Sequence, residues 1–407
     1  MKEKPVFSGI ICEFNPLHWG HQYLLTQAKR HSQGVVCVMS GNWVQRGEPA
    51  ILSKFARAEA AVRCGADLVV DLPVYWACAS AERFAYGAVS LLHHLGCIDE
   101  LWFGSECGDA PLLQKLAQFL ISEDFEKELA PFLRMGISFA AARQKAVEKS
   151  FGSQYAAILE SANNILGVEY CKALLRCGSK IQPRTVQRIG GQHDSVEEVR
   201  PHAVLSASQL RQLLMQEQPL NGLVPEPSLE IISREMARGR CPGELTRLER
   251  AVLAQLRTMG PESFACLPDI SEGLENRLYA VSRKAQSLPE LYDGVKSKRY
   301  SHARIRRLIA YAFIGITNPL PDSPPYARIL AASEQGKQLL GEIARSSQIP
   351  LLTRPKDFFS ASPQIAAVFA AEQRATDLYA LCLPSPPACG WECRQKLQII
   401  VPSTKNT

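Results

Sequence analysis

The sequence lacks any long hydrophobic run. No uninterrupted apolar stretch reaches the roughly 18 residues that a helix needs to cross a bilayer. The first apolar run, Val6–Ile11, is too short for the core of a secretion signal, and it follows the polar start Met1–Pro5 directly. These absences argue against membrane and secreted proteins. We expect a cytoplasmic protein with no membrane partner.

The sequence also lacks a cysteine pair with Cys-x-x-Cys spacing, although it contains 13 cysteines. Many of them lie within apolar runs, as Cys37 and Cys78 do. The tightest group, Cys382, Cys389 and Cys393, lies in a Pro-rich segment without a nearby histidine. We therefore expect reduced and mostly buried thiols, and no zinc site.

Further absences concern chemistry. There is no Gly-x-x-x-x-Gly-Lys-Ser/Thr loop, so γ-phosphate transfer of the P-loop kind is not expected. No carboxylate cluster indicates a dedicated metal site, and no internal repeat or low-complexity segment is present.

The formal net charge is only +6 over 407 residues. With 46% hydrophobic and 21% charged residues, the composition is typical of a globular chain of two or three domains.

Strand-like and helical patterns alternate over the first two hundred residues. The strand-like runs are Val6–Ile11, Val35–Met39, Leu68–Leu72, Leu101–Phe103 and Thr185–Ile189. The helical patterns between them are Gln22–Arg30, Lys54–Arg63, Glu82–Leu95 and Leu112–Ile121. This alternation predicts an α/β fold in which helices cover both faces of a parallel sheet.

Two regions depart from the alternation. A longer helical stretch at about Glu126–Lys149 indicates a helical insertion, which we place at about residues 123–160. After Glu226 strand patterns nearly disappear and helical periodicity dominates, and Pro225 and Pro227 mark a boundary. We therefore predict an N-terminal α/β domain over residues 1–224 and a mainly helical C-terminal domain over residues 225–407.

The most informative segment links the first strand to the first helix, and its sequence is Ile10-Ile11-Cys12-Glu13-Phe14-Asn15-Pro16-Leu17-His18-Trp19-Gly20-His21. A tight turn at Asn15-Pro16 is followed by a helix that begins within His18–His21. The free N–H groups and positive dipole end of such a helix attract phosphate, and Gly20 allows a close approach.

Two histidines spaced three apart lie on one face of the first helical turn. His18 and His21 can therefore donate hydrogen bonds to phosphate oxygens and stabilise charge as a phosphorus centre is attacked. A chance match to His-x-Gly-His is the alternative. The position after a strand and before a helix favours the catalytic interpretation, because ligands bind beyond the carboxyl ends of strands in doubly wound sheets.

With its neighbours, this segment resembles the tRNA(Met) cytidine acetate ligases, a branch of the HxGH nucleotidyltransferase-like superfamily. The motifs that carry the resemblance are Glu13-Phe14-Asn15-Pro16, His18-Trp19-Gly20-His21, Met39 to Ala50, Lys54-Phe55-Ala56-Arg57, Gly65 to Pro73, Phe103-Gly104-Ser105-Glu106, Asn163 to Tyr170 and Lys296 to Tyr300. The resemblance covers nearly the whole chain and weakens after about residue 360. It implies a Rossmann-type sheet that binds ATP, and a helical region that binds tRNA.

The resemblance also implies which residues bind ATP. They are Ile10, Ile11, Cys12, Glu13, Phe14, Asn15, Pro16, Leu17, His18, Trp19, Gly20, His21, Gly104, Asn164, Arg188, Ser208 and Arg211. Asn163 stays open as the alternative to Asn164, and Arg184 as the alternative to Arg188.

The chemistry of these positions agrees with the assignment. Gly104 ends a strand where a side chain would block adenosine, although a simple strand-end turn is the alternative. Asn164 would be the spare amide of an Asn-Asn pair of which one caps the following helix. Arg188 and Arg211 suit phosphate oxygens, and Ser208 starts a helix where a hydroxyl either caps or binds phosphate.

A basic run near the middle of the C-terminal half is the candidate tRNA contact. Lys298, Arg299, Arg306 and Arg307 lie close together along the chain, next to the aromatic Tyr300. Positive side chains with a stacking platform suit an RNA backbone and its bases. A solvated helix face is the alternative.

The resemblance predicts a ligase. The resemblance implies that acetate attacks the α-phosphate of ATP, and that the wobble cytidine of elongator tRNA(Met) then attacks acetyl-adenylate and releases AMP. Mg²⁺ is expected because it accompanies ATP. The alternatives are a small-molecule nucleotidylyltransferase, which would not need the basic helical half, and a non-catalytic tRNA-binding protein, which would not need an intact His-x-Gly-His.

Overall fold

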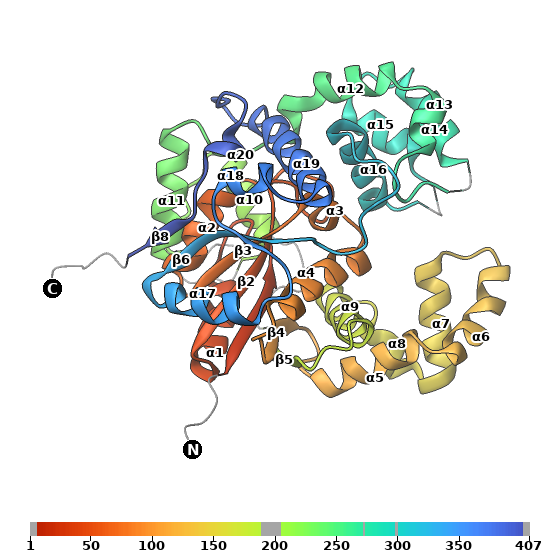
Figure 1. Cartoon of the computed structure of the whole chain (residues 1–407). Coiled ribbons are helices and arrows are strands. Elements are labelled where there is room, and N and C mark those ends of the chain that lie inside the picture. Colours follow the sequence, from red (N-terminus) through yellow and green to blue (C-terminus); the bar gives the residue numbers. More distant parts are fainter. Residues whose placement is uncertain (1–5, 189–204, 272, 298–299, 402–407) are drawn as a thin grey trace.

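The structure, a computed structural model, describes residues 6–188, 205–271, 273–297 and 300–401. Within these residues eight strands form one sheet, in the order β5-β4-β1-β2-β3-β6-β7, with β8 paired to β6 (Figure 1). The strands are β1 (Phe7–Cys12), β2 (Gly34–Ser40), β3 (Leu68–Leu72), β4 (Glu100–Ser105), β5 (Gln182–Gln187), β6 (Ala327–Ser333), β7 (Leu351–Leu352) and β8 (Gln398–Ile400). All pairs are parallel except β3–β6. The predicted α/β fold with a mostly parallel sheet is confirmed.

Helices cover the sheet and extend beyond it. Those of the first half are α1 (Trp19–His31), α2 (Lys54–Arg63), α3 (Val74–Ala77), α4 (Ala81–Leu95), α5 (Ala110–Leu120), α6 (Glu123–Arg134), α7 (Phe139–Phe151), α8 (Ser153–Ile158), α9 (Ala162–Arg176) and α10 (Ala207–Met215). Those of the second half are α11 (Glu226–Ala237), the short 3-10 helix Leu245–Leu248, α12 (Glu249–Thr258), α13 (Pro261–Ala265), α14 (Leu274–Ser282), α15 (Leu288–Val295), α16 (His302–Ile314), α17 (Glu334–Ser346), α18 (Pro355–Phe359), α19 (Pro363–Ala380) and α20 (Trp391–Arg394).

The central strands are apolar on both faces because both faces are covered. Every residue of β2 is buried, and its side chains alternate between two cores. Cys37 and Met39 point toward α1, α2 and α16, whereas Val36 and Val38 point toward α4, α9 and α17. Continuous apolar runs of this kind are typical of parallel strands between two helical layers.

Local signals fix where the main helices begin and end. The Ser53 and Ser80 hydroxyls accept hydrogen bonds from backbone N–H groups in the first turns of α2 and α4, and Ser301 caps α16 in the same way. Gly96 and Gly315 end α4 and α16 with positive φ angles of 76° and 78°. The caps of α2 and α4 explain why the predicted helices Lys54–Arg63 and Glu82–Leu95 agree closely with the structure.

Two predicted details are wrong. The single helical stretch Glu126–Lys149 is broken between α6 and α7, because Gly136 takes a φ of 73° and the Ser138 hydroxyl caps α7. The Asn163-Asn164 pair does not cap α9, since Ser161 is the N-cap and both asparagines lie in the first turn.

The second half of the chain also returns to the sheet. The sequence pattern did not predict β6, β7 or β8, and β6 pairs with β3. Just past the predicted boundary, Ile231 and Ile232 of α11 pack on Ala56 and Ala60 of α2. The two predicted parts therefore share a sheet and a hydrophobic core.

Two groups of helices project from the sheet region on the same side of the view (Figure 1). One contains α6, α7 and α8, which coincide with the predicted helical insertion. The other contains α12 to α16, and we call it the helical lobe. In the part of the chain that the structure describes, none of the helices has the length and apolar character needed to span a membrane.

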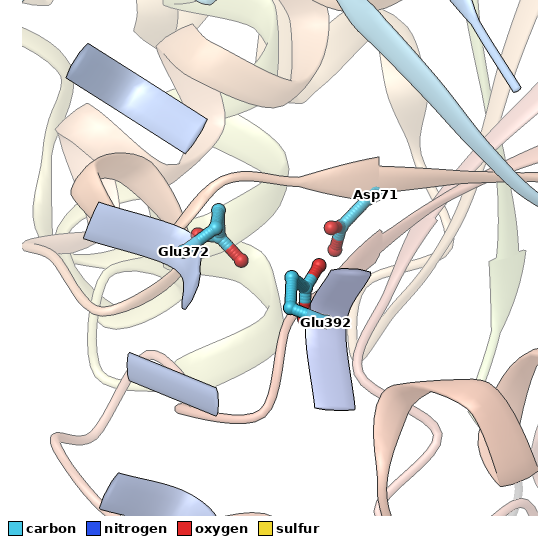
Figure 2. Close-up of side chains that lie close together, drawn as sticks. All are labelled: Asp71, Glu372 and Glu392. Atoms are coloured by element: carbon cyan, nitrogen blue, oxygen red, sulfur yellow. The ribbon is translucent and has the colours of Figure 1, made fainter. Parts of the chain in front are cut away.

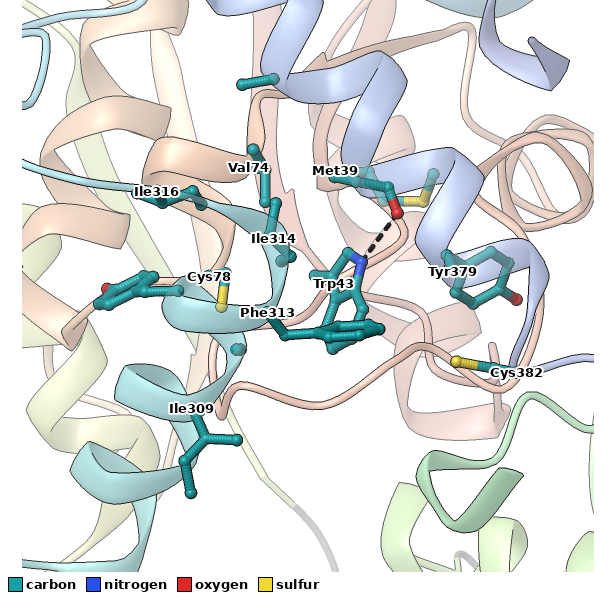
Figure 3. Close-up of a cluster of buried hydrophobic side chains, with 14 of the residues drawn as sticks. Met39, Trp43, Val74, Cys78, Ile309, Phe313, Ile314, Ile316, Tyr379 and Cys382 are labelled. Atoms are coloured by element: carbon teal, nitrogen blue, oxygen red, sulfur yellow. Dashed lines mark hydrogen bonds between the residues drawn. The ribbon is translucent and has the colours of Figure 1, made fainter. Parts of the chain in front are cut away.

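The helical lobe is attached through Trp43, which follows β2 (Figure 3). The Trp43 indole donates a hydrogen bond of 2.9 Å to the Ala375 carbonyl of α19. Its ring lies edge-on to Phe313 of α16, with centroids 6.2 Å apart. One buried side chain thus joins the end of β2, the lobe and the helix α19.

A buried ionic group joins the sheet and α2 to α19 and α20 (Figure 2). The Asp71, Glu372 and Glu392 carboxylates come from β3, α19 and α20 and point toward one another. The Lys54 ammonium at the start of α2 contacts all three, at 2.6, 2.9 and 2.7 Å, and Arg328 of β6 also pairs with Glu392. Among the described residues this is the group of carboxylates best placed to share a metal ion, and Lys54 already supplies its positive charge.

Candidate functional site

A cavity of about 440 Å³ opens at the carboxyl ends of β1 and β4. This volume is in the range of small-molecule pockets. Its polar lining includes Glu13, Gln45, Arg46, Asn163, Arg188 and Arg211, and its apolar lining includes Ile11, Leu24, Phe84, Phe103, Ile165, Leu166 and Tyr170. Three guanidinium groups and one carboxyl group leave an excess of positive charge, which suits a phosphate-bearing ligand with an apolar base.

His18 and His21 hold the first turn of α1 together. Nδ1 of His18 accepts a hydrogen bond from the Gly20 amide at 3.1 Å, and Nδ1 of His21 accepts one from the His18 amide at 3.3 Å. This is a capping box in which imidazoles take the place of the usual Ser and Glu. The two rings stack with centroids 3.8 Å apart, as their predicted place on one helix face requires.

The capping hydrogen bonds also determine which ring nitrogen of each histidine carries the proton. Because Nδ1 accepts in both rings, the proton of each neutral imidazole is on Nε2. Burial, together with the nearby charge of Arg188, lowers the pKa of His18 to about 4. Burial, His18 and Arg188 hold the pKa of His21 well below its ordinary value. At neutral pH the pair therefore offers two Nε2–H donors without net charge.

Two arginines flank the histidines. Arg188 follows β5, where its backbone N–H donates to the Ser105 carbonyl at 3.0 Å and its side chain is exposed toward the cavity. A Cβ on Gly104 would lie 3.3 Å from Cγ of Arg188. The small residue near the end of β4 thus leaves room for the stem of Arg188.

Arg211 reaches the cavity from α10. Its guanidinium donates to the Asn15 carbonyl at 2.9 Å and to the Ser208 hydroxyl at 3.1 Å. The N-cap of this helix is Ser206, not Ser208, and it forms a capping box with Gln209. Ser208 therefore orients Arg211 from within the first turn.

The two asparagines in the first turn of α9 have different surroundings. Asn164 is buried, and its side-chain oxygen accepts hydrogen bonds from the Glu106 and Cys107 amides at 2.9 and 3.1 Å. Asn163 lines the cavity, and its amide donates to the Glu106 carboxylate at 2.7 Å. Asn164 thus shapes the loop after β4, while Asn163 lies in the wall of the cavity.

The other predicted residues divide into those that line the cavity and those that do not. Ile11, Cys12, Glu13, Phe14 and Asn15 line it, whereas Ile10, Pro16, Leu17, His18, Trp19 and Gly20 do not. The rival Arg184 pairs with Glu100 at 3.0 Å, away from the lining. Sequence reasoning did not single out Gln45 and Arg46, whose only signal is their place within the Met39–Ala50 motif.

Those two residues belong to the loop of residues 41–53 that connects β2 to α2, which we call the β2–α2 loop. The Gln45 amide donates to the Glu13 carboxylate at 2.8 Å. Farther along, Gly47 has a φ of 79° and packs against the backbone of α16, and Glu48 pairs with Arg306 at 2.7 Å. The loop thus contacts the cavity on one side and the helical lobe on the other.

The basic segment is only partly exposed. Tyr300 is 8% exposed, with its hydroxyl donating to the Ser271 carbonyl and Arg304 above its ring. Arg307 is also 8% exposed and lies 3.8 Å from Asp269. Lys298 and Arg299 lie outside the described residues. In this arrangement Tyr300 and Arg307 face the interior of the lobe.

The sheet and the histidine pair define a nucleotide-binding protein of the nucleotidyltransferase type. A family model described as HIGH Nucleotidyl Transferase matches residues 6–389. The tRNA(Met) cytidine acetate ligase of Acetivibrio thermocellus is 39% identical over 93% of this chain and 95% of its own length, and that of Thermoanaerobacter sp. is 38% identical over 94% and 96%. The chain belongs to the tRNA(Met) cytidine acetate ligase family.

A solved structure supports the assignment. The crystal structure of Thermotoga maritima TmcAL bound with alpha-thio ATP is 31% identical, with a TM-score of 0.90 over 97% of this chain and 100% of that one. The same protein without ligand gives a TM-score of 0.91. The predicted family and fold are confirmed.

Proposed function

We propose that this chain uses ATP to activate acetate and transfers the acetyl group to N4 of the wobble cytidine in elongator tRNA(Met). The observation that carries the proposal is the stacked pair of neutral histidines, of which His21 lines a cavity that also contains three arginines, in a chain of this family. The relative with alpha-thio ATP supports nucleotide binding at such a site.

In the first step, acetate attacks the α-phosphate of ATP. Arg188 and Arg211 hold the triphosphate, and Nε2–H of His21, backed by His18, donates to the oxygen that gains charge. The products are acetyl-adenylate and pyrophosphate. Mg²⁺ enters as part of the ATP substrate. The described cavity lining offers one carboxyl group, so phosphate oxygens and water would be its main ligands.

In the second step, the cytidine amine attacks the acetyl carbon and AMP leaves. We propose that the helical lobe carries the tRNA through Lys298, Arg299 and Arg306, together with the exposed Arg283 and Lys284. Because the lobe contacts the β2–α2 loop, tRNA bound there lies close to the cavity. A tRNA substrate makes the cytoplasm the expected compartment.

Mass spectrometry of tRNA(Met) tests the proposal directly. Incubation with the protein, ATP and labelled acetate should place one labelled acetyl group on the wobble cytidine. Acetyl-coenzyme A without ATP should not replace them. Unmodified tRNA, or AMP joined to a small molecule, would overturn the proposal.

Binding of tRNA to the lobe has a separate test. The K298A/R299A variant should weaken tRNA binding and flatten its salt dependence by about one unit of slope for each phosphate that is no longer neutralised. ATP affinity measured without tRNA serves as the control. An unchanged salt slope would place the tRNA elsewhere.

A further inference from the structure

The second step of the proposed function leaves a chemical requirement open. When the cytidine N4 amine attacks the acetyl carbon, the nitrogen must lose a proton. A base that accepts this proton needs a free lone pair within reach of the cavity. Among the described side chains that line the cavity, few have such a lone pair.

Most of them cannot accept a proton. His21 already uses Nδ1 to accept the His18 amide and holds its own proton on Nε2, and burial disfavours its charged form. Arg46, Arg188 and Arg211 are cations. Burial raises the pKa of Cys12, so its thiol stays protonated.

Tyr170 is excluded for a similar reason, since burial raises the pKa of its phenol. Glu13 is the carboxyl group that remains among the described cavity-lining residues. It follows β1 directly, so the rigid edge of the sheet fixes its backbone at the place where ligands bind in this fold.

The surroundings of Glu13 fix its side chain as well. One carboxylate oxygen accepts the Gln45 amide at 2.8 Å, and the Arg57 guanidinium donates to the Glu13 backbone carbonyl. Burial raises the pKa of the carboxyl group, while the Gln45 amide, Arg57, Arg211 and Arg46 lower it. Burial has the largest effect and the net pKa is raised, so the Glu13 carboxylate is a stronger base than one in water.

We infer that Glu13 is the general base of acetyl transfer, an assignment that rests on the proposed function. The N4 lone pair forms the C–N bond to the acetyl carbon. The bond between that carbon and the phosphate oxygen breaks, and AMP leaves with its electron pair. The N4 proton passes to the Glu13 carboxylate, which later returns it to water.

The E13Q variant tests this role, because glutamine keeps the size of the side chain and an oxygen that accepts the Gln45 amide. Two rates are compared: acetate-dependent ATP–pyrophosphate exchange, and single-turnover acetyl transfer to tRNA from preformed acetyl-adenylate. The ratio of transfer to exchange should fall by about 10²–10⁴-fold in E13Q. The transfer rate of the wild type should rise with pH and level off, and E13Q should lose this inflection.

Two further variants complete the design. E13D retains a carboxylate and should retain an inflection, even if transfer is slower, which also serves if E13Q does not fold. D99N is the matched control, since the Asp99 carboxylate accepts the Phe7 amide at 3.1 Å at the opposite end of β1. Its ratio of transfer to exchange should stay at the wild-type value.

The possible results distinguish a failure of the proposed function from a failure of the role of Glu13. Wild-type protein without acetate-dependent exchange or tRNA acetylation would overturn the proposed function and this role together. Wild-type activity with an unchanged ratio and an unchanged pH profile in E13Q would overturn the role of Glu13 alone. The proton would then pass to water or to the departing phosphate.

Discussion

Replacing Gly47 by alanine should separate the helical lobe from the β2–α2 loop. The residue has a φ of 79°, and an added Cβ would lie 2.6 Å from the carbonyl carbon of Arg306 and from the amide nitrogen of Arg307. Ordinary contacts of a Cβ begin near 3.4 Å, so the loop and α16 must move apart by about 0.8 Å. Backbone atoms cannot avoid the clash by changing rotamer.

The magnitude has two parts. Alanine in the left-handed region costs about 1–2 kcal/mol, and overpacking of a well-filled contact costs about 1–3 kcal/mol. G47A should therefore lose about 2–5 kcal/mol of stability. Gly136 provides the matched control, because its φ is 73° and nothing lies within 4 Å of an added Cβ. G136A should lose only the first part.

Urea unfolding of the two variants measures this difference, and hydrogen exchange of the α16 amides locates it. Faster exchange in α16 is expected for G47A only, because the strain falls on that helix. Equal losses of stability in the two variants, with unchanged exchange in α16, would refute the role of packing.

Three other perturbations have defined outcomes. H18A and H21A should each lower acetate-dependent pyrophosphate exchange by about 10²–10³-fold, because each removes an imidazole from the donor pair; an unchanged rate in the double variant would contradict this. Stability should fall as the pH drops from 6.5 to 4, since the unfolded chain protonates His18 near 6.5 and the folded protein only at a pKa of about 4. That difference amounts to about 3 kcal/mol, and H18Q should flatten the pH dependence of urea unfolding, whereas an unaltered dependence would refute the assignment. K54M should cost about 3–5 kcal/mol because it leaves three buried carboxylates without their ammonium group; a loss below about 1 kcal/mol would contradict the network.

The sequence predicted those features that local patterns encode. Apolar runs located β1 to β4, and the turn at Asn15-Pro16 located the helix that His18 caps. The strand β6 was not predicted, because its place is set by pairing with β3, some 260 residues earlier in the chain. For the rest of the second half, only helical periodicity and capping signals were available, and these predict helices but not how they pack.

In the candidate site too, features set by local sequence were predicted and features set by distant contacts were not. The two histidines lie at the N-cap and in the first turn of one helix, so their spacing alone predicted their geometry. Gln45 and Arg46 line the cavity because a loop folds over it, which no periodicity encodes. A run of basic residues likewise does not reveal which side chains face inward, as Arg307 does.

The buried Lys54 group has a consequence for the order of folding during synthesis. Lys54 and Asp71 are made early, but two of their partners, Glu372 and Glu392, lie near the end of the chain. Until α19 and α20 have left the ribosome, the charges at the start of α2 must stay in water. The start of α2 and the end of β3 therefore reach their complete buried surroundings only when translation is almost finished, and a chain that stops near residue 224 would lack two of the three carboxylates that Lys54 contacts.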